Sequence, residues 1–351
     1  MNDNRSFFRD TVERILADTL TPADVEAAEE GRLPRALIRA LDQNGILTML
    51  APEAQGGIGA TLTEAFTILR ALGAAAAPGP ALETILGQSL LAQAGLDIDG
   101  TLALAFVTEG SAPEAGATQW TAPPRLAAVP WARLADRIVA ILPAGGGTRL
   151  AVSAPADWTV ATGADAAGEP RDDLSAAVVP VRVADLPDLP FDTVVATAAV
   201  LRAGQMLGAL EWILARSVDY AMERRQFGRE IGKFQVVQQM LAELSGHVLA
   251  ARAIAEAAAE GFTPVLVAAA LSRLGDAADA AITIGHQVHG AIGFSREYTL
   301  NHRTRRLMAW RDDFRTVPAW RRHLAGGFAG LDHAALWPAI TKSGLRKLAA
   351  E

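Results

Sequence analysis

The sequence predicts an α+β protein in which two helical regions flank a region of short β-strands. Apolar residues recur at helical spacing in residues 1–100 and again in 190–325, with Val12, Ile15 and Leu16 as one example. Between these regions, residues 101–189 hold short apolar runs separated by glycines and prolines, which is typical of strands and turns. Residues 326–351 follow as a tail with a short helix near Leu336. We therefore expect three domains and a tail, divided at these positions.

The first region is predicted to contain several helices. Residues 34–47 form one of them, with Pro34 in the first turn, where its missing N–H does no harm. Residues 63–72 and 82–94 form two more, and the run Pro78, Gly79 and Pro80 separates them. The glycine-rich stretch at residues 49–59 is by itself only a turn signal.

The middle region is predicted to be an antiparallel β domain. Its short apolar runs cover residues 102–107, 137–142, 150–153, 158–161 and 176–183. Three consecutive glycines at 145–147 and several prolines supply the turns between them. Trp120 and Trp131 are expected to pack in the core or between domains.

The third region centres on two long helices joined by a basic turn. Apolar residues at positions 207, 210, 214, 218 and 221 place one apolar face on the first helix, which is expected to end near Phe227 and Gly228. The second helix is expected to begin near Phe234. The turn between them carries Arg224, Arg225, Gln226, Arg229 and Lys233. Guanidinium groups bind phosphate through paired hydrogen bonds, so the turn is a candidate phosphate site; a solvated basic turn is the alternative.

Composition narrows the class of protein. The chain has 351 residues, 50% of them hydrophobic, which is enough for a large core. Its formal charge of −7 argues against a general nucleic-acid role, and the absence of cysteine excludes disulfides and thiolate metal ligands. We predict no metal site, and we expect His286, His289 and His302 to be ordinary core or surface residues. The N-terminus has no signal-peptide layout, so we expect a cytoplasmic protein without a membrane span.

Two sequence blocks in the third region carry a family resemblance. Residues 220–243 read Y-x-x-x-R-x-Q-F-G-x-x-I-x-x-F-Q-x-x-Q-x-x-L-A-E, and residues 287–298 are similar to Q-x-x-G-G-x-G-F-x-x-E-Y. In this order and at this separation, the blocks resemble the C-terminal helical domain of the acyl-CoA dehydrogenase family. Residues 51–59 are similar to that family's P-E-x-x-G-G-x-G stretch. The resemblance implies an N-terminal helical domain, a middle β domain and a C-terminal four-helix bundle.

The resemblance also implies a flavin site shared between two subunits. Arg224, Gln226, Phe227 and Gln235 would contact the FAD of a neighbouring subunit, with Arg224 at the pyrophosphate. Gln287, Gly290 and the backbone of Ala291 would bind the adenosine half, where glycine permits close backbone approach. Thr108 follows the first predicted strand and resembles part of the family's T-E-P-G-A-G-S-D loop at the flavin ring, whereas residues 110–116 depart from it. Thr316 matches the threonine of the family's Y-E-G-T segment and joins the implied cofactor-binding residues.

The position of the catalytic base is where the sequence departs from the family. Family members use a carboxylate to remove the α-proton of an acyl-CoA thioester while the β-hydrogen leaves as hydride to the flavin. The two usual positions of that base fall at Phe314 and at Ala198, and neither is a carboxylate. A shift of one residue would bring in Asp313. Asp312 and Asp313 are otherwise expected to pair with Arg311 or Arg315 on a helix surface.

Two functions follow from this resemblance. In the first, the chain is an FAD-dependent enzyme that desaturates the acyl group of an acyl-CoA thioester, from fatty acid or sterol side-chain metabolism, with Asp313 as an unusual base. In the second, it is a non-catalytic partner that completes the FAD site of a homologous subunit in a hetero-oligomer. A family relative with other flavin chemistry is a third, weaker alternative. The implied electron acceptor is electron-transfer flavoprotein.

Overall fold

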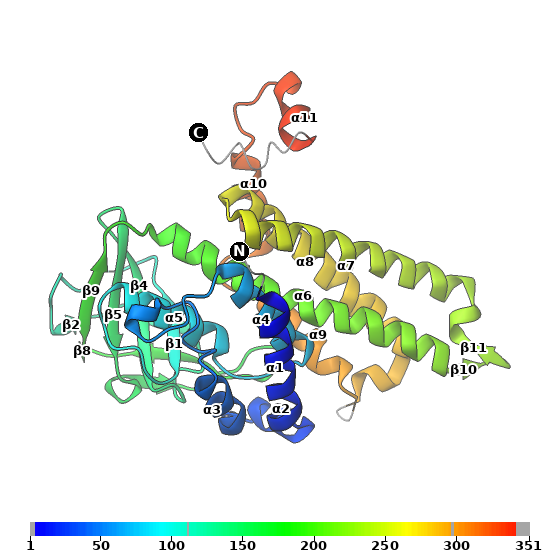
Figure 1. The fold of residues 1–351 in the computed structure, drawn as a ribbon, viewed down its shortest axis with the longest axis horizontal. Helices are drawn as coiled ribbons and strands as arrows, with labels where there is room; N and C mark the ends of the chain where they lie inside the picture. Colours follow the sequence, from blue (N-terminus) through cyan, green and yellow to red (C-terminus); the bar gives the residue numbers. More distant parts are fainter. Residues whose placement is uncertain (1–3, 111, 296–297, 342–351) are drawn as a thin grey trace. The chain divides into compact units, whose positions relative to one another are not determined.

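A computed structural model describes residues 4–110, 112–295 and 298–341 (Figure 1). Its elements follow the predicted order of helices, then strands, then helices, which confirms the predicted fold class. The chain divides into two compact units: residues 1–65 with 77–198, and residues 66–76 with 199–351. Each unit is described by itself below. The domain boundaries expected from the sequence stay predictions, although the changes of secondary structure fall near residues 100 and 190.

The first unit combines the N-terminal helices with all the strands of the middle region. Its long helices are α1 (Arg5–Thr19), α2 (Pro22–Glu29), α3 (Arg35–Gln43) and α5 (Ala81–Gln93). The strands are β1 (Leu102–Phe106), β2 (Gln119–Thr121), β3 (Leu126–Pro130), β4 (Arg137–Ala144), β5 (Gly147–Ser153), β6 (Thr159–Ala161), β7 (Arg171–Ser175), β8 (Val178–Pro180) and β9 (Arg182–Leu186). Single 3-10 turns lie at η1 (Glu53–Gln55) and η2 (Pro155–Asp157).

The strands form small sheets, the largest in the order β1-β4-β5-β9. β1 pairs with β4 in parallel, with Leu102 opposite Arg137. The other strand pairs are antiparallel, so the predicted all-antiparallel domain is corrected at this one pair. Trp120 and Trp158 meet edge to face at 6.3 Å in the core of this region. Trp120 and Trp131 are both buried, as expected.

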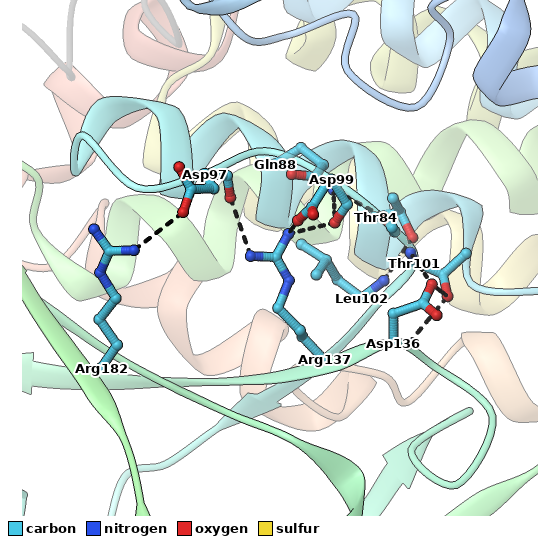
Figure 2. A network of polar contacts seen from close by, with 10 residues as sticks. Thr84, Gln88, Asp97, Asp99, Thr101, Leu102, Asp136, Arg137 and Arg182 are labelled. Atoms are coloured by element: carbon cyan, nitrogen blue, oxygen red, sulfur yellow. Dashed lines mark hydrogen bonds and ion pairs between the residues drawn. The ribbon is translucent and has the colours of Figure 1, made fainter. Parts of the chain in front are cut away.

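Helix α5 lies directly against β1 (Figure 2). Thr84 Oγ1 accepts a hydrogen bond from Leu102 N at 3.1 Å, and Gln88 Nε2 donates to Asp99 O at 2.9 Å. The carboxylate of Asp136 accepts from Thr101 N at 2.7 Å. Because buried polar groups need hydrogen-bond partners, these bonds stabilise the entry of the chain into its first strand.

The second unit is a bundle of long helices. It contains the end of α4 (Leu62–Ala74), most of α6 (Phe191–Glu223), α7 (Gln235–Gly261), α8 (Pro264–His289), α9 (Leu300–Trp310), α10 (Val317–Gly326) and α11 (His333–Thr341). Thr263 caps α8 by accepting from Leu266 N, with Pro264 in the first turn. The shorter elements are β10 (Arg225–Gln226), β11 (Arg229–Glu230), η3 (Ile231–Lys233) and η4 (Gly290–Phe294).

Helices α4 and α6 cross at van der Waals contact through glycines. A Cβ atom on Gly208 would lie 1.9 Å from Arg70 O, so any larger residue would separate the two backbones. Charged hydrogen bonds also stabilise the crossing, because Glu211 on α6 accepts from Arg70 at 2.6 Å and from Arg252 on α7 at 2.5 Å.

By length and composition, α6 alone among the described helices passes for a membrane span, but 83% of its most apolar window is buried. It is therefore best explained as a core helix.

Candidate flavin-binding site

The basic turn between α6 and α7 is a two-stranded hairpin. Helix α6 ends at Glu223, before the expected Phe227, and Arg225 and Gln226 then pair with Glu230 and Arg229. Phe227 and Gly228 form the turn with φ of 50° and 80°. Two successive left-handed residues match the twist of paired strands, which is why the predicted loop closes as a hairpin.

The cations of this hairpin differ in their partners. Glu230 pairs with Arg225 at 2.9 Å and with Lys233 at 2.6 Å. Arg224 is exposed, and within the described part of the chain its guanidinium group forms no ion pair. Gln226 and Gln235 are exposed as well, and the side chain of Phe227 is 91% exposed. Arg229 is likewise exposed and forms no ion pair with a described residue. This hairpin therefore presents two uncompensated cations, Arg224 and Arg229, beside a bare aromatic ring, which suits an anionic, ring-bearing ligand.

The second block lies where α8 ends. Gly290 adopts φ of 63° and terminates the helix, and a Cβ atom there would meet nothing within 4 Å. Gln287, Gly290 and Ala291 are all exposed. The space at Gly290 allows a ligand to approach the backbone closely. The glutamate of the block's E-Y pair, Glu297, lies outside the described residues.

A cluster of rings joins the two blocks. Tyr220, the first residue of one block, stacks on His289 of the other with ring centroids 4.5 Å apart, and Tyr298 lies 5.2 Å from His289. Arg216 on α6 donates to the hydroxyl of Tyr298 at 3.0 Å and to both carboxylate oxygens of Glu223. Glu223 raises the pKa of Arg216, and burial raises the pKa of Tyr298. This cluster was not predicted from the sequence, although the first block begins at Tyr220 and the second ends at Tyr298.

The region of the expected base contains a buried ion pair. Arg202 Nε lies 3.0 Å from Asp313 Oδ2, with side chains only 5% and 10% exposed. Arg202 also contacts Gln205 Oε1 and lies over the rings of Trp310 and Phe314 at 5.5 and 5.8 Å. Phe314 adopts φ of 62°. No local sequence pattern predicts this ion pair, because Arg202 lies on α6, far from Asp313 in the sequence.

The remaining predicted residues occupy separate places. Asp312 pairs with Arg311 at 3.1 Å, as expected, but both residues lie in the turn after α9 and not on a helix. Thr316 caps α10 by accepting from Ala319 N at 3.4 Å. Ala198 is buried on α6, one turn before Arg202. Thr108 is exposed just after β1 in the first unit, and Ser111 of the same loop lies outside the described residues.

These features define a class of protein. Along the chain, helical regions precede and follow a region of strands, and two motif blocks meet near the ends of α6 and α8. Residues 2–101 match the family model for the acyl-CoA dehydrogenase N-terminal domain, and residues 193–311 match the model for its C-terminal domain. The chain is 32% identical over 304 residues to acyl-CoA dehydrogenase IpdE2 of Mycobacterium tuberculosis, covering 85% of this chain and 89% of that protein. The chain belongs to the acyl-CoA dehydrogenase family.

Other relatives agree with this membership. IpdE2 of Mycolicibacterium smegmatis is 30% identical over 308 residues, covering 86% of this chain and 91% of that protein. The ChsE4-ChsE5 complex from Mycobacterium tuberculosis has a chain of similar fold, with a TM-score of 0.83 at 23% identity over 95% of this chain and 99% of that one. Butyryl-CoA dehydrogenase from Megasphaera elsdenii has a TM-score of 0.75 at 18% identity, over 93% and 98% of the two chains. These structures confirm the fold.

Proposed function

We propose that this chain is the non-catalytic partner in an FAD-dependent acyl-CoA dehydrogenase assembly, completing the flavin site of a homologous subunit that supplies the base. The observation that carries this proposal is the ion pair between Arg202 and Asp313. Asp313 is the carboxylate that a one-residue shift brings to the usual position of the base. A base must offer a free lone pair to the substrate's α-carbon, whereas the carboxylate of Asp313 is held by a buried guanidinium.

The exposed residues of the two blocks support FAD as the ligand. An anionic pyrophosphate would compensate Arg224, which has no ion pair with any described residue. Gly290 leaves room for close approach, and Gln287 and Ala291 are exposed beside it. When bound, FAD supplies the hydride acceptor for α,β-desaturation of an acyl-CoA thioester. In this proposal, the chain's own residues hold and orient the nucleotide, while the homologous chain covers it.

The relatives support a mixed assembly as well. The chain is similar in fold to a chain from a complex of two differently named subunits, ChsE4 and ChsE5. Electron-transfer flavoprotein is the electron acceptor that we propose. The rival function, in which this chain desaturates the thioester with Asp313 as its base, requires the carboxylate to leave Arg202 at each turnover. We favour the partner function because a buried cation deprived of its carboxylate is costly.

Anaerobic spectroscopy separates the two functions. The purified chain alone, supplied with FAD, is titrated with a panel of acyl-CoA thioesters, and flavin absorbance is followed. We expect no bleaching from the chain alone, and bleaching after it is combined with a homologous chain that carries the glutamate of Y-E-G-T. Bleaching by the chain alone that disappears in Asp313→Asn would establish the rival function, because a general base contributes about 10²–10⁴ in rate.

The control variant removes the charge of Asp313 without leaving the guanidinium behind. Arg202→Met combined with Asp313→Asn takes away both members of the pair. In the mixed assembly, this double variant should bleach the flavin at the wild-type rate. A loss of at least a hundredfold in a folded, flavin-loaded assembly would contradict the partner function.

A further inference from the structure

His289 carries a buried ring nitrogen without a hydrogen-bond partner in the described part of the chain. His289 lies on the last turn of α8 and is 4% exposed. Nδ1 lies 2.8 Å from Gly285 O. A carbonyl oxygen only accepts hydrogen bonds, so Nδ1 carries the proton and Nε2 presents a lone pair. No described donor reaches Nε2.

The surroundings of His289 keep this lone pair in place. The ring is stacked on Tyr220 at 4.5 Å and contacts Tyr298 at 5.2 Å, so it has little freedom to turn. Burial lowers the pKa of His289, and the positive charge of Arg216 lowers it further. The imidazole is therefore neutral at neutral pH. A buried acceptor without a donor is unfavourable, and such groups are usually satisfied by water or a ligand.

The place of this acceptor indicates which ligand satisfies it. His289 belongs to the second block and stacks on the first residue of the first block, so it lies where the two blocks meet. The next residue, Gly290, is exposed and has open space at its Cβ position. We propose that His289 Nε2 accepts a hydrogen bond from an N–H or O–H group in the adenosine half of FAD. This inference rests on the proposed flavin site.

His286, one turn earlier on α8, provides the matched comparison. The hydroxyl of Thr304 donates to Asn301 O at 3.3 Å, so its oxygen accepts from His286 Nε2 at 3.0 Å. The lone pair of His286 therefore lies on Nδ1, where it faces the backbone of Gly293; a Cβ atom there would be 3.2 Å away. Both histidines stack on a neighbouring aromatic ring, and each has a buried ring nitrogen without a described partner. They differ in position, because His286 lies beside the buried Gly293 whereas His289 adjoins the exposed Gly290.

Binding of FAD to the assembled, flavin-depleted protein tests the proposal. Titrations use the wild type and the variants His289→Phe, His286→Phe and His289→Gln, followed by flavin fluorescence. His289→Phe keeps the stacked ring and should raise the Kd for FAD about 3- to 10-fold, the net worth of one neutral hydrogen bond. His286→Phe should leave the Kd unchanged. His289→Gln, whose amide oxygen also accepts, should retain most of the affinity.

Analogues of FAD then identify the donor. One analogue carries hypoxanthine in place of adenine and lacks the exocyclic amine, and two others lack the 2′- or the 3′-hydroxyl of the adenosine ribose. With one of these ligands, the wild type and His289→Phe should bind equally. Three results would overturn the proposal. The wild type and His289→Phe bind FAD equally, or His286→Phe loses as much affinity as His289→Phe, or the difference between the wild type and His289→Phe persists with every analogue. If Arg224→Ala also leaves FAD binding unchanged, the proposed flavin site itself fails; if only His289→Phe does, this inference alone fails.

Discussion

The buried ion pair between Arg202 and Asp313 is expected to affect the free energy of unfolding. Asp313→Asn leaves a buried guanidinium without its carboxylate, and breaking a buried pair from one side costs about 3–5 kcal/mol. Replacing both charges with apolar residues, as in Arg202→Met with Asp313→Leu, should cost much less. Urea unfolding of the two variants measures the difference. A double variant as unstable as the single one would mean that packing, and not charge, dominates this site.

The buried histidines predict how stability depends on pH. Burial lowers the pKa of His286 and His289 below the ordinary value of 6.5. The unfolded chain therefore binds protons more readily, so stability is full above about pH 6.5 and falls as the pH drops toward the folded pKa values. His289→Phe should lose less stability than the wild type between pH 7.5 and 5.5, as measured by urea unfolding at each pH. Identical losses would show that His289 does not contribute.

Single residues also mark the limit of what the sequence predicts. The pairing of Asp312 with Arg311 was predictable, because the two residues are adjacent. The pairing of Asp313 with Arg202 was not, since it depends on how α6 packs near the end of α9. The stacking of His289 on Tyr220 was not predicted for the same reason, because it joins segments that are distant in the sequence.

At the scale of the elements, the shape of the β10–β11 hairpin is predicted to affect FAD binding. Gly228 has φ of 80° and open space around it, so Gly228→Val adds backbone strain without a clash. We expect weaker FAD retention, because the hairpin no longer holds Arg224 in place, with little change in global unfolding. Gly246→Ala is the control: this exposed α7 glycine also has open space, and alanine should stabilise the helix by about 0.5–1 kcal/mol. Unchanged FAD retention in Gly228→Val would mean that the hairpin's shape does not matter for binding.

Helices were predicted better than strands. The predicted helices at 63–72 and 82–94 correspond to α4 and α5 within two residues at each end, because their apolar spacing is regular. The predicted helix at 34–47 ends at Gln43, where Asn44 and Gly45 form a turn. Strand β7 reads Arg-Asp-Asp-Leu-Ser and has no apolar run to indicate it. The parallel pairing of β1 with β4 is set by contacts between strands, which no local pattern records.

At the scale of the whole molecule, the fold class was predictable because the two motif blocks and the order of helical and strand regions indicated the same family fold. The division of the chain into two compact units was not predictable. The division passes through α4 and leaves Phe66–Ala76 with the C-terminal helices. The close crossing of Gly208 with Arg70 O explains this grouping, since α4 and α6 approach more closely than side chains normally allow. A contact of that kind depends on a glycine of one helix meeting the backbone of another in space, which no local sequence pattern records.

The last prediction concerns the assembly. Arg224, Phe227 and Gln287 are exposed in the single chain, so a flavin held by them alone would face water. With FAD at micromolar protein concentration, sedimentation should therefore report at least a dimer. Arg224→Ala should lower FAD occupancy tenfold or more at limiting FAD, because a charge-assisted hydrogen bond is worth about 1.5–3 kcal/mol. Arg225→Ala is the matched control, since that cation is already paired with Glu230 and should change occupancy little. The prediction is wrong if a monomer retains FAD, or if Arg224→Ala and Arg225→Ala lose the same FAD occupancy. The hairpin would then be a solvated basic turn without a ligand.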